Sequence, residues 1–459
     1  MSPTKQEPGH QEARPANDRI GRRSLLRSSC AAAGSVAVSR VGQGALASPA
    51  GTSPAEVDRP VRVSKERLDA LAAKSYAVFN EGNVLGPFSA ARHGARHDVE
   101  LRRLTTSTRL PETGEQVQVS GLLALPAGSQ GSLPVVSWQH GTILSFDQVP
   151  SNLTRLKAET YELRDNVDSL ETLFNIQRFA GNGYAVIAAD YPGKGPYRDG
   201  RAEAYAVKAA TVQCCLDVLQ AGVRELEKSG LRPSASFLNG WSQGALNTQW
   251  LKQELQRRGT KVAAAAAQSP FNDLPDTFHY WSSPQSFIPS TEKSYPLPPA
   301  WIVPCIVVLL GSYRRYYGLG DLFETAIKPQ YRAFAERYWS DYRLDAETAK
   351  TLPPAADFLT DGFFERFTHD TNGKFLRRLA ANSTTFLDYD SPIRFYYGLA
   401  DEALYPGLVK MALASGGRDM AGVPVKGASH RATFLASLYG DAAVLDGKST
   451  VLDWFNTLR

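Results

Sequence analysis

Cysteine is scarce in this sequence, which argues against a disulfide-stabilised domain and against a domain built on a cysteine metal site. The 459 residues contain four cysteines, of which Cys214, Cys215 and Cys305 lie beyond the N-terminal segment. An odd number at irregular spacing does not suit a disulfide scaffold. Cys305 could form a disulfide with one of the adjacent pair, or all three could be buried as small apolar side chains. The cysteines show no metal-binding spacing with the seven histidines, so we expect no metal site and no cofactor.

Long apolar runs and an excess of charge are also missing. The most apolar stretch, residues 301–310, is interrupted by Pro304 and is too short to cross a bilayer. The formal net charge is +5, but the first 47 residues hold seven Lys/Arg and three Asp/Glu, which leaves 44 basic and 43 acidic residues elsewhere. We therefore expect no transmembrane segment and no nucleic-acid partner. The oligomeric state is left open.

The N-terminus has the features of an export signal. Residues 21–27 (Gly-Arg-Arg-Ser-Leu-Leu-Arg) resemble a twin-arginine signal, a modestly apolar run follows from residue 30, and Ala45-Leu46-Ala47 fits signal-peptidase cleavage. Residues 1–47 are thus predicted to be a twin-arginine-type signal peptide of a periplasmic or extracellular protein. The alternative is a disordered basic tail. Cys30 is a poor candidate for lipid attachment because the residues before it do not form a lipobox.

Beyond the signal, the chain divides into a predicted linker at 48–62 and an α/β core that is interrupted once. In 63–269 and 390–459, short buried strands alternate with amphipathic helices, which predicts a mostly parallel sheet with helices on both faces. The expected strands are 98–108, 117–125, 133–138, 184–189, 262–268, 393–397 and 423–426, with a further strand ending before Ser242. The expected helices include 65–79, 168–182, 202–228 and 407–414.

The alternation stops between residues 270 and 389. This segment reads as helices and loops, including one helix at 321–343, and it holds 23 of the chain's 46 aromatic residues. We interpret it as a mainly helical cap inserted after the sixth strand. Most of its aromatic side chains are expected to pack the cap's own core, and others to line an apolar approach to the site.

A candidate nucleophile stands in Gly240-Trp241-Ser242-Gln243-Gly244, which matches the Gly-x-Ser-x-Gly pattern. The preceding residues suit a buried strand, and the apolar residues that follow recur at helical spacing. A sharp turn from strand to helix is the context this pattern requires, so we predict that Ser242 is a nucleophile. The alternative is a strand–helix turn with an incidental serine.

Three histidines follow Ser242 and could activate it as a base. His279 and His369 fall inside the predicted cap without a preceding strand, whereas His430 comes directly after the last predicted strand. We therefore predict that His430 is the general base.

The acid that orients this histidine should also follow a strand. Asp401 does so and lies 29 residues before His430, which leaves room for one helix and one strand. Asp390 precedes the strand and would lie at the wrong end of the sheet, and Glu402 would point elsewhere. Asp401 is the predicted acid, with Glu402 and Asp390 as alternatives.

The anionic intermediate of such a reaction needs preorganised N–H donors. One is expected to be the backbone N–H of Gln243, and the other that of Thr142 or its neighbour in His140-Gly141-Thr142. His140 and Asp190 precede the serine and are expected to be structural.

These motifs together give the chain a resemblance to a known superfamily. The five segments 139–142, 190–195, 240–244, 398–401 and 427–430 resemble, in this order, the motifs of an α/β-hydrolase. The chain is most similar to secreted lipase/esterase-like serine hydrolases with a large cap. The resemblance implies hydrolysis of small-molecule or lipid-like esters through an acyl-enzyme on Ser242.

Two other functions remain open. A serine peptidase acting on short peptides could use Arg314, Arg315 or Glu324 to bind a substrate terminus. A non-catalytic binding protein of the same fold is the third possibility.

Overall fold

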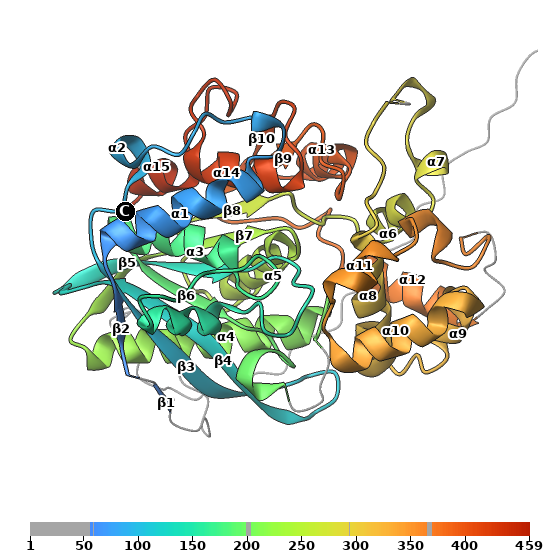
Figure 1. Cartoon of the computed structure of the whole chain (residues 1–459), viewed down its shortest axis with the longest axis horizontal. Helices are drawn as coiled ribbons and strands as arrows, with labels where there is room; N and C mark the ends of the chain where they lie inside the picture. The colour runs from blue at the N-terminus through green and yellow to red at the C-terminus, as the bar shows by residue number, and fades with distance from the viewer. Residues whose placement is uncertain (1–55, 58, 199–202, 293, 365–369) are drawn as a thin grey trace, which may run out of the picture. The chain divides into compact units, whose positions relative to one another are not determined.

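The described residues are organised around one large mixed β-sheet (Figure 1). The computed structural model describes residues 56–57, 59–198, 203–292, 294–364 and 370–459. In this part of the chain the sheet has ten strands: nine join in the order β1-β3-β4-β6-β5-β7-β8-β9-β10, and the tenth, β2, pairs with β3. The strands are β1 (Glu56–Val57), β2 (Val61–Val63), β3 (Val99–Arg109), β4 (Gln116–Pro126), β5 (Ser132–Gln139), β6 (Ala185–Ala189), β7 (Arg232–Trp241), β8 (Ala264–Gln268), β9 (Ile393–Gly398) and β10 (Met420–Val425).

The sheet is parallel from β6 to β10 and antiparallel at its other edge. The antiparallel edge extends further than the sequence predicted, because β1 and β2 both pair with β3 inside the segment taken as a linker. The linker prediction is therefore wrong for these residues. Val61 and Val63 alternate with exposed Arg62, so one face of this short strand is apolar and can be buried.

Helices cover both faces of the sheet, as predicted. Along β4 and β5 alternate side chains enter two separate cores: Leu123 and Val135 enter one, Leu122 and Val136 the other. The first core is covered by α4 (Lys208–Lys228), α5 (Gln243–Arg257) and α13 (Pro406–Ser415). The second is covered by α1 (Lys65–Phe79), α3 (Leu170–Arg178), α14 (His430–Tyr439) and α15 (Val451–Asn456).

Between β8 and β9 the chain forms a helical insertion, which lies beside the sheet at the right of Figure 1. Counted from β3 along the chain, β8 is the sixth strand. The helices are α6 (Leu274–Ser282), α7 (Pro284–Phe287), α8 (Ile302–Tyr316), α9 (Leu322–Ala326), α10 (Pro329–Asp341), α11 (Ala346–Lys350) and α12 (Asp370–Asn382). Residues 302–310 of the apolar run form the buried first part of α8, and Trp301 precedes the helix. No described helix is long and apolar enough to cross a bilayer.

The single helix predicted at 321–343 is wrong, because α9 and α10 are separate helices. Pro329 begins α10, and the residue before a proline is disfavoured in helical conformation. Lys328, the residue before Pro329, has a φ of −56° and a ψ of 139° and is not helical. Ile327 is extended and forms an isolated bridge with Leu359.

The three cysteines of the described chain are free and buried, so the burial alternative holds and the disulfide alternative does not. The predicted signal peptide at 1–47 lies outside the described residues.

Candidate active site

Ser242 occupies a strained turn between β7 and α5. Its φ of 58° and ψ of −122° lie in a region that side-chain-bearing residues rarely adopt. The backbone N–H of Ser242 donates a 2.8 Å hydrogen bond to the carbonyl of Gln268 at the end of β8, and this bond anchors the turn. The sequence predicted such a turn from the five-residue motif.

The two glycines of the motif allow close packing around this turn. A Cβ on Gly244 would lie 1.9 Å from the carbonyl oxygen of Gln139 at the end of β5. A Cβ on Gly240 would lie 2.3 Å from the hydroxyl oxygen of Thr248 on α5. Real side chains cannot come so close, so both positions require glycine.

His430 and Asp401 form a buried pair. The Nδ1 atom of His430 lies 3.0 Å from each carboxylate oxygen of Asp401, and the two residues are 3% and 1% exposed. Asp401 Oδ1 also accepts the backbone N–H groups of Ala403 (3.0 Å) and Leu404 (2.9 Å). The carboxylate is thus held on the Nδ1 side of the imidazole, which leaves Nε2 available for proton transfer.

Two opposing influences set the pKa of His430. Burial lowers the pKa, but the negative charge and hydrogen bond of Asp401 raise it, and the net pKa lies above its ordinary value. Asp401 therefore favours the protonated imidazole that a general base becomes during the reaction.

The two alternative acids lie elsewhere. Glu402 Oε2 accepts the backbone N–H of His430 at 3.0 Å, so it contacts the main chain at the start of α14. The carboxylate of Asp390 is 3.7 Å from the ammonium of Lys252 and is largely exposed. Of the three predicted candidates, Asp401 is the one hydrogen-bonded to the imidazole.

Ser242 and His430 line one cavity of about 280 Å³. Aromatic side chains from two parts of the chain share it. The Trp241 ring lies 5.0 Å from the His430 ring, and the ring of Trp301, from the helical insertion, lies 6.1 Å from it. The remaining lining residues are Phe79, Glu81, Thr142, Ile143, Leu144, Gln148, Asp165, Glu171, Glu402 and Arg431. Of the other histidines after Ser242, His279 lies in α6 outside this lining, and His369 is outside the described residues.

The insertion also contacts the loop that carries Asp401. The hydroxyl of Tyr295 donates a 2.7 Å hydrogen bond to the carbonyl of Asp401. The hydroxyl of Tyr280 donates to the carbonyl of Glu402 at 3.1 Å, and the indole of Trp281 donates to the carbonyl of Ala403 at 2.7 Å. Three successive carbonyls of the acid loop are therefore bonded by insertion residues.

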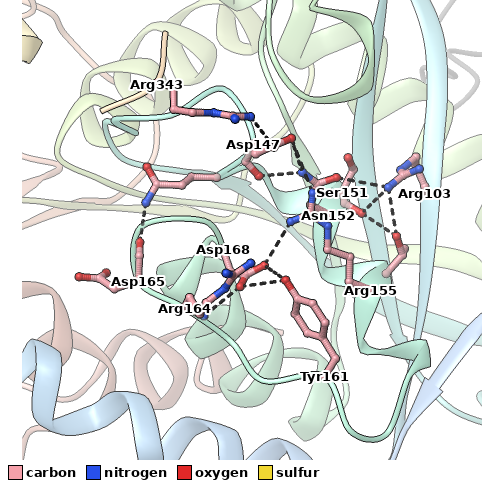
Figure 2. A network of polar contacts seen from close by, with 12 residues as sticks. Arg103, Asp147, Ser151, Asn152, Arg155, Tyr161, Arg164, Asp165, Asp168 and Arg343 are labelled. Atoms are coloured by element: carbon pink, nitrogen blue, oxygen red, sulfur yellow. Dashed lines mark hydrogen bonds and ion pairs between the residues drawn. The ribbon is translucent and has the colours of Figure 1, made fainter. Parts of the chain in front are cut away.

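One wall of the cavity is a loop that ends in the 3₁₀ helix Pro150–Lys157 and is braced by polar contacts (Figure 2). Arg155 lies 3.6 Å from both Asp147 and Asp168, and Arg343 of the insertion lies 3.7 Å from Asp147. The side chain of Gln148 accepts the backbone N–H of Leu144 at 2.8 Å. These contacts fix the main chain around a cavity-lining segment.

The two predicted oxyanion residues lie at the same site. Thr142 lines the cavity, and its hydroxyl lies 2.8 Å from that of Tyr205. Gln243 follows Ser242 at the start of α5, and its side-chain amide donates a 2.7 Å hydrogen bond to Glu203. That the backbone N–H groups of Thr142 and Gln243 bind an oxyanion stays a prediction.

Beneath Gln243 lies a buried charged network that the sequence did not predict. The carboxylate of Glu203 is 2.7 Å from the ammonium of Lys194, and both side chains are fully buried. The hydroxyl of Tyr342, from the end of α10, also donates to this carboxylate. No motif marks Glu203, since the segment before α4 has no regular pattern.

His140 and Asp190 have the surroundings of structural residues. His140 is stacked on Tyr191 with ring centroids 4.2 Å apart, and its Nδ1 is 2.8 Å from the carbonyl of Gly141. Asp190 accepts the Ser120 hydroxyl at 2.5 Å and the backbone N–H of Ser151 at 2.9 Å. Neither residue lines the cavity of Ser242.

The sequence analysis also missed the acidic character of the cavity. Glu171, in the first turn of α3, is 7% exposed, and burial raises its pKa to about 7, with nearby Asp165 adding to the shift. Glu81, Asp165 and Glu402 share the lining, where Arg431 is the single basic residue and lies 3.0 Å from Asp165. No cluster of potential metal ligands occurs among the described residues.

Comparison with known proteins identifies the fold. No family model matches the sequence, and no curated protein matches it either. The rice cell wall degrading esterase LipA from Xanthomonas oryzae has a similar structure, with a TM-score of 0.66 and 20% identity over 90% of this chain and 100% of that chain. Candida antarctica lipase A in its closed state gives a TM-score of 0.53 at 15% identity, over 72% and 73% of the two chains. With the strand order above, these similarities confirm the predicted α/β-hydrolase fold.

Proposed function

We propose that this chain, folded as an α/β-hydrolase, is a serine hydrolase that cleaves carboxylic esters through an acyl-enzyme on Ser242. The observation that carries the proposal is that Ser242 and His430 line one cavity. Ser242 sits on a strained turn, and His430, already hydrogen-bonded to Asp401, lines the same cavity. Among proteins of this fold, LipA is described as an esterase and the Candida protein as a lipase.

The chemistry follows from these positions. His430 Nε2 takes the proton of the Ser242 hydroxyl as its oxygen attacks the ester carbonyl, and Asp401 stabilises the resulting imidazolium. The backbone N–H groups of Gln243 and Thr142 are proposed to bind the oxyanion. His430 then gives the proton to the leaving alcohol. Water, activated by the same histidine, hydrolyses the acyl-enzyme and restores Ser242.

A serine peptidase is the second candidate, and the acidic cavity lining is the observation that favours it. The substrate-binding residues predicted for a peptidase do not line the cavity: Arg314 lies 2.6 Å from Glu336, and Arg315 lies 2.9 Å from Glu115. Glu171, however, lines the cavity as a buried carboxylate and could bind a substrate amine. We place this function second because no other part of the lining is specific for a peptide.

Two assays separate the candidates. We expect wild-type protein to hydrolyse p-nitrophenyl esters, with aminoacyl-p-nitroanilides hydrolysed at least a hundredfold more slowly. A fluorophosphonate probe should label the wild type and not Ser242→Ala. The reverse order of substrates would establish a peptidase. Absence of both labelling and hydrolysis in wild-type protein would instead support a non-catalytic binding protein.

Export through the twin-arginine pathway completes the proposal and rests on residues 21–47 of the sequence. Replacement of Arg22 and Arg23 by lysine should retain the protein in the cytoplasm of a twin-arginine-competent bacterial host. N-terminal sequencing of the exported protein should begin at Ser48. Export of the double-lysine variant at the wild-type level would contradict the proposed pathway.

A further inference from the structure

A second cavity, of about 260 Å³, lies where α1, α3, α15 and the short helix α2 (Ala90–His93) meet. It is distinct from the cavity of Ser242 and shares no lining residue with it. Glu171 and Arg178 lie seven residues apart on α3, about 10 Å at 1.5 Å per residue, and line the first and the second cavity respectively. We call the second one the basic cavity, because four arginines line it: Arg92, Arg96, Arg178 and Arg459.

The key residue of the basic cavity is Arg178, a buried cation that forms no ion pair, although the charges of Asp453 and Asp69 are near enough to favour its protonated form. It is 4% exposed, and its Nη1 donates a 3.0 Å hydrogen bond to the carbonyl of His93. Its Nε has no hydrogen-bond partner, and no carboxylate of the described residues lies within ion-pair distance of it. A buried charge is costly unless an opposite charge compensates it.

The carboxylates of the cavity do not balance the four arginines. Two line it, Asp69 and Asp453, and both have other partners. Asp69 Oδ1 accepts the backbone N–H of Ala95 at 2.9 Å and the side-chain amide of Gln177 at 2.7 Å. Asp453 Oδ2 accepts the hydroxyl of Thr450 at 2.7 Å. The lining therefore has more positive than negative charge.

The neighbouring His93 is affected by this excess of positive charge. Burial lowers its pKa to about 4, with further lowering by Arg178 and Arg92. His93 is thus neutral near pH 7 and adds no charge. The electrostatic potential at this position is positive and comes from the arginines.

We propose that the basic cavity binds a small oxyanion, such as phosphate or the phosphate of a larger molecule. The anion supplies the ion-pair partner that Arg178 lacks, and the exposed Arg92 and Arg96 complete the site from the rim. Guanidinium groups suit such a ligand because their N–H groups pair with two oxygens of one anion.

The test is calorimetric titration of the whole protein with inorganic phosphate, at constant ionic strength set by sodium chloride. We expect saturable binding with one site per chain. Arg96→Gln, at an exposed position, should weaken it about tenfold or more, and Arg178→Met should abolish it. Arg337→Gln removes an exposed arginine of α10, outside the cavity, and should leave the affinity unchanged. If Arg178→Met does not fold, a comparison of the phosphate affinities of Arg96→Gln and Arg337→Gln still tests the proposal.

A second arm identifies the source of the anion. Vesicles of phosphatidylglycerol, with phosphatidylcholine vesicles as the control, are sedimented with the same proteins. Binding to anionic vesicles alone, lost in Arg96→Gln and kept in Arg337→Gln, supports the site with a lipid headgroup as its ligand. The proposal is overturned if neither phosphate nor the anionic vesicles bind the wild-type protein. It is also overturned if all variants bind them equally.

Discussion

The side-chain amide of Gln243 donates a 2.7 Å hydrogen bond to the buried carboxylate of Glu203, which also neutralises Lys194 at 2.7 Å. Glu203 thus connects Gln243, the residue after Ser242, to a fully buried cation. Burial lowers the pKa of Lys194, and Glu203 opposes this lowering. Loss of the carboxylate would leave an isolated charge in the core.

We predict that Glu203→Gln lowers the free energy of unfolding by about 3–5 kcal/mol, the usual cost of breaking a buried ion pair. The double variant Glu203→Gln/Lys194→Met removes both charges and should be more stable than the single variant. Urea denaturation of the three proteins measures this coupling. A double variant that is less stable than the single one would show that Lys194 does not depend on Glu203.

The Asp401→Asn variant should keep its fold and lose about 10⁴-fold in kcat, because the amide no longer stabilises the imidazolium of His430. Glu402→Gln is the matched control. Its side chain bonds the backbone of His430 and not the ring, so the loss should be about tenfold or less. Comparable losses in both variants would contradict the assignment of Asp401.

The pH profile of kcat/KM should rise with the loss of a proton from His430, since a general base must be neutral. Asp401 raises the pKa of His430 above its ordinary value of 6.5 despite burial, so the ascending limb should lie above pH 6.5. In Asp401→Asn the carboxylate no longer opposes the effect of burial, so the pKa of His430 should fall. The ascending limb of the variant's remaining activity should therefore move to lower pH. A limb at the same pH in both proteins would assign the titration to another group.

Glu171→Gln should stabilise the protein at alkaline pH. Burial raises the pKa of Glu171 from 4.5 to about 7, so the folded state disfavours the carboxylate. The resulting destabilisation begins as pH rises above 4.5, grows until about pH 7 and is constant beyond it. The difference in unfolding free energy between variant and wild type should therefore be larger at pH 8 than at pH 4.5, by as much as about 3 kcal/mol.

Urea denaturation at the two pH values checks this prediction. The matched control is Glu162→Gln, whose side chain is 77% exposed. It should show the same stability relative to wild type at both pH values. A Glu171 variant that behaves like this control would show that Glu171 is ionised in the fold without cost.

Two glycines near Ser242, one in its turn and one in the loop after β5, should differ in their tolerance of a methyl group. Gly244→Ala would place Cβ 1.9 Å from the Gln139 carbonyl, and we expect insoluble protein or a loss above about 4 kcal/mol. Gly141→Ala would place Cβ 3.0 Å from the edge of the Trp241 ring, and we expect soluble protein with a loss of about 1–3 kcal/mol. Thermal unfolding of both variants compares them. Equal stability would mean that β5 can shift away from α5.

The parts of this structure that follow from local pattern could be predicted from the sequence. The helix at 65–79 and the strands around Ser242 have apolar spacing that fixes their type, and the triad candidates follow strands in a required order. The break in the helix predicted at 321–343 was missed because the aromatic spacing continues across Pro329, although the proline itself is a signal for a break. Glu171 and Glu203 were missed since burial, which decides their chemistry, arises from distant elements.

The hydrogen bonds from Tyr280, Trp281 and Tyr295 to the acid loop constrain how this protein can be engineered or can diverge. The insertion supplies Trp301 to the lining of the cavity, so a protein engineer could exchange it for the insertion of a related protein to change that lining. Here such an exchange also removes the donors that hold the carbonyls of Asp401 and its two neighbours. The insertion and the loop that carries Asp401 therefore depend on each other structurally. A chimera that keeps these hydrogen bonds must take both segments from the same parent protein.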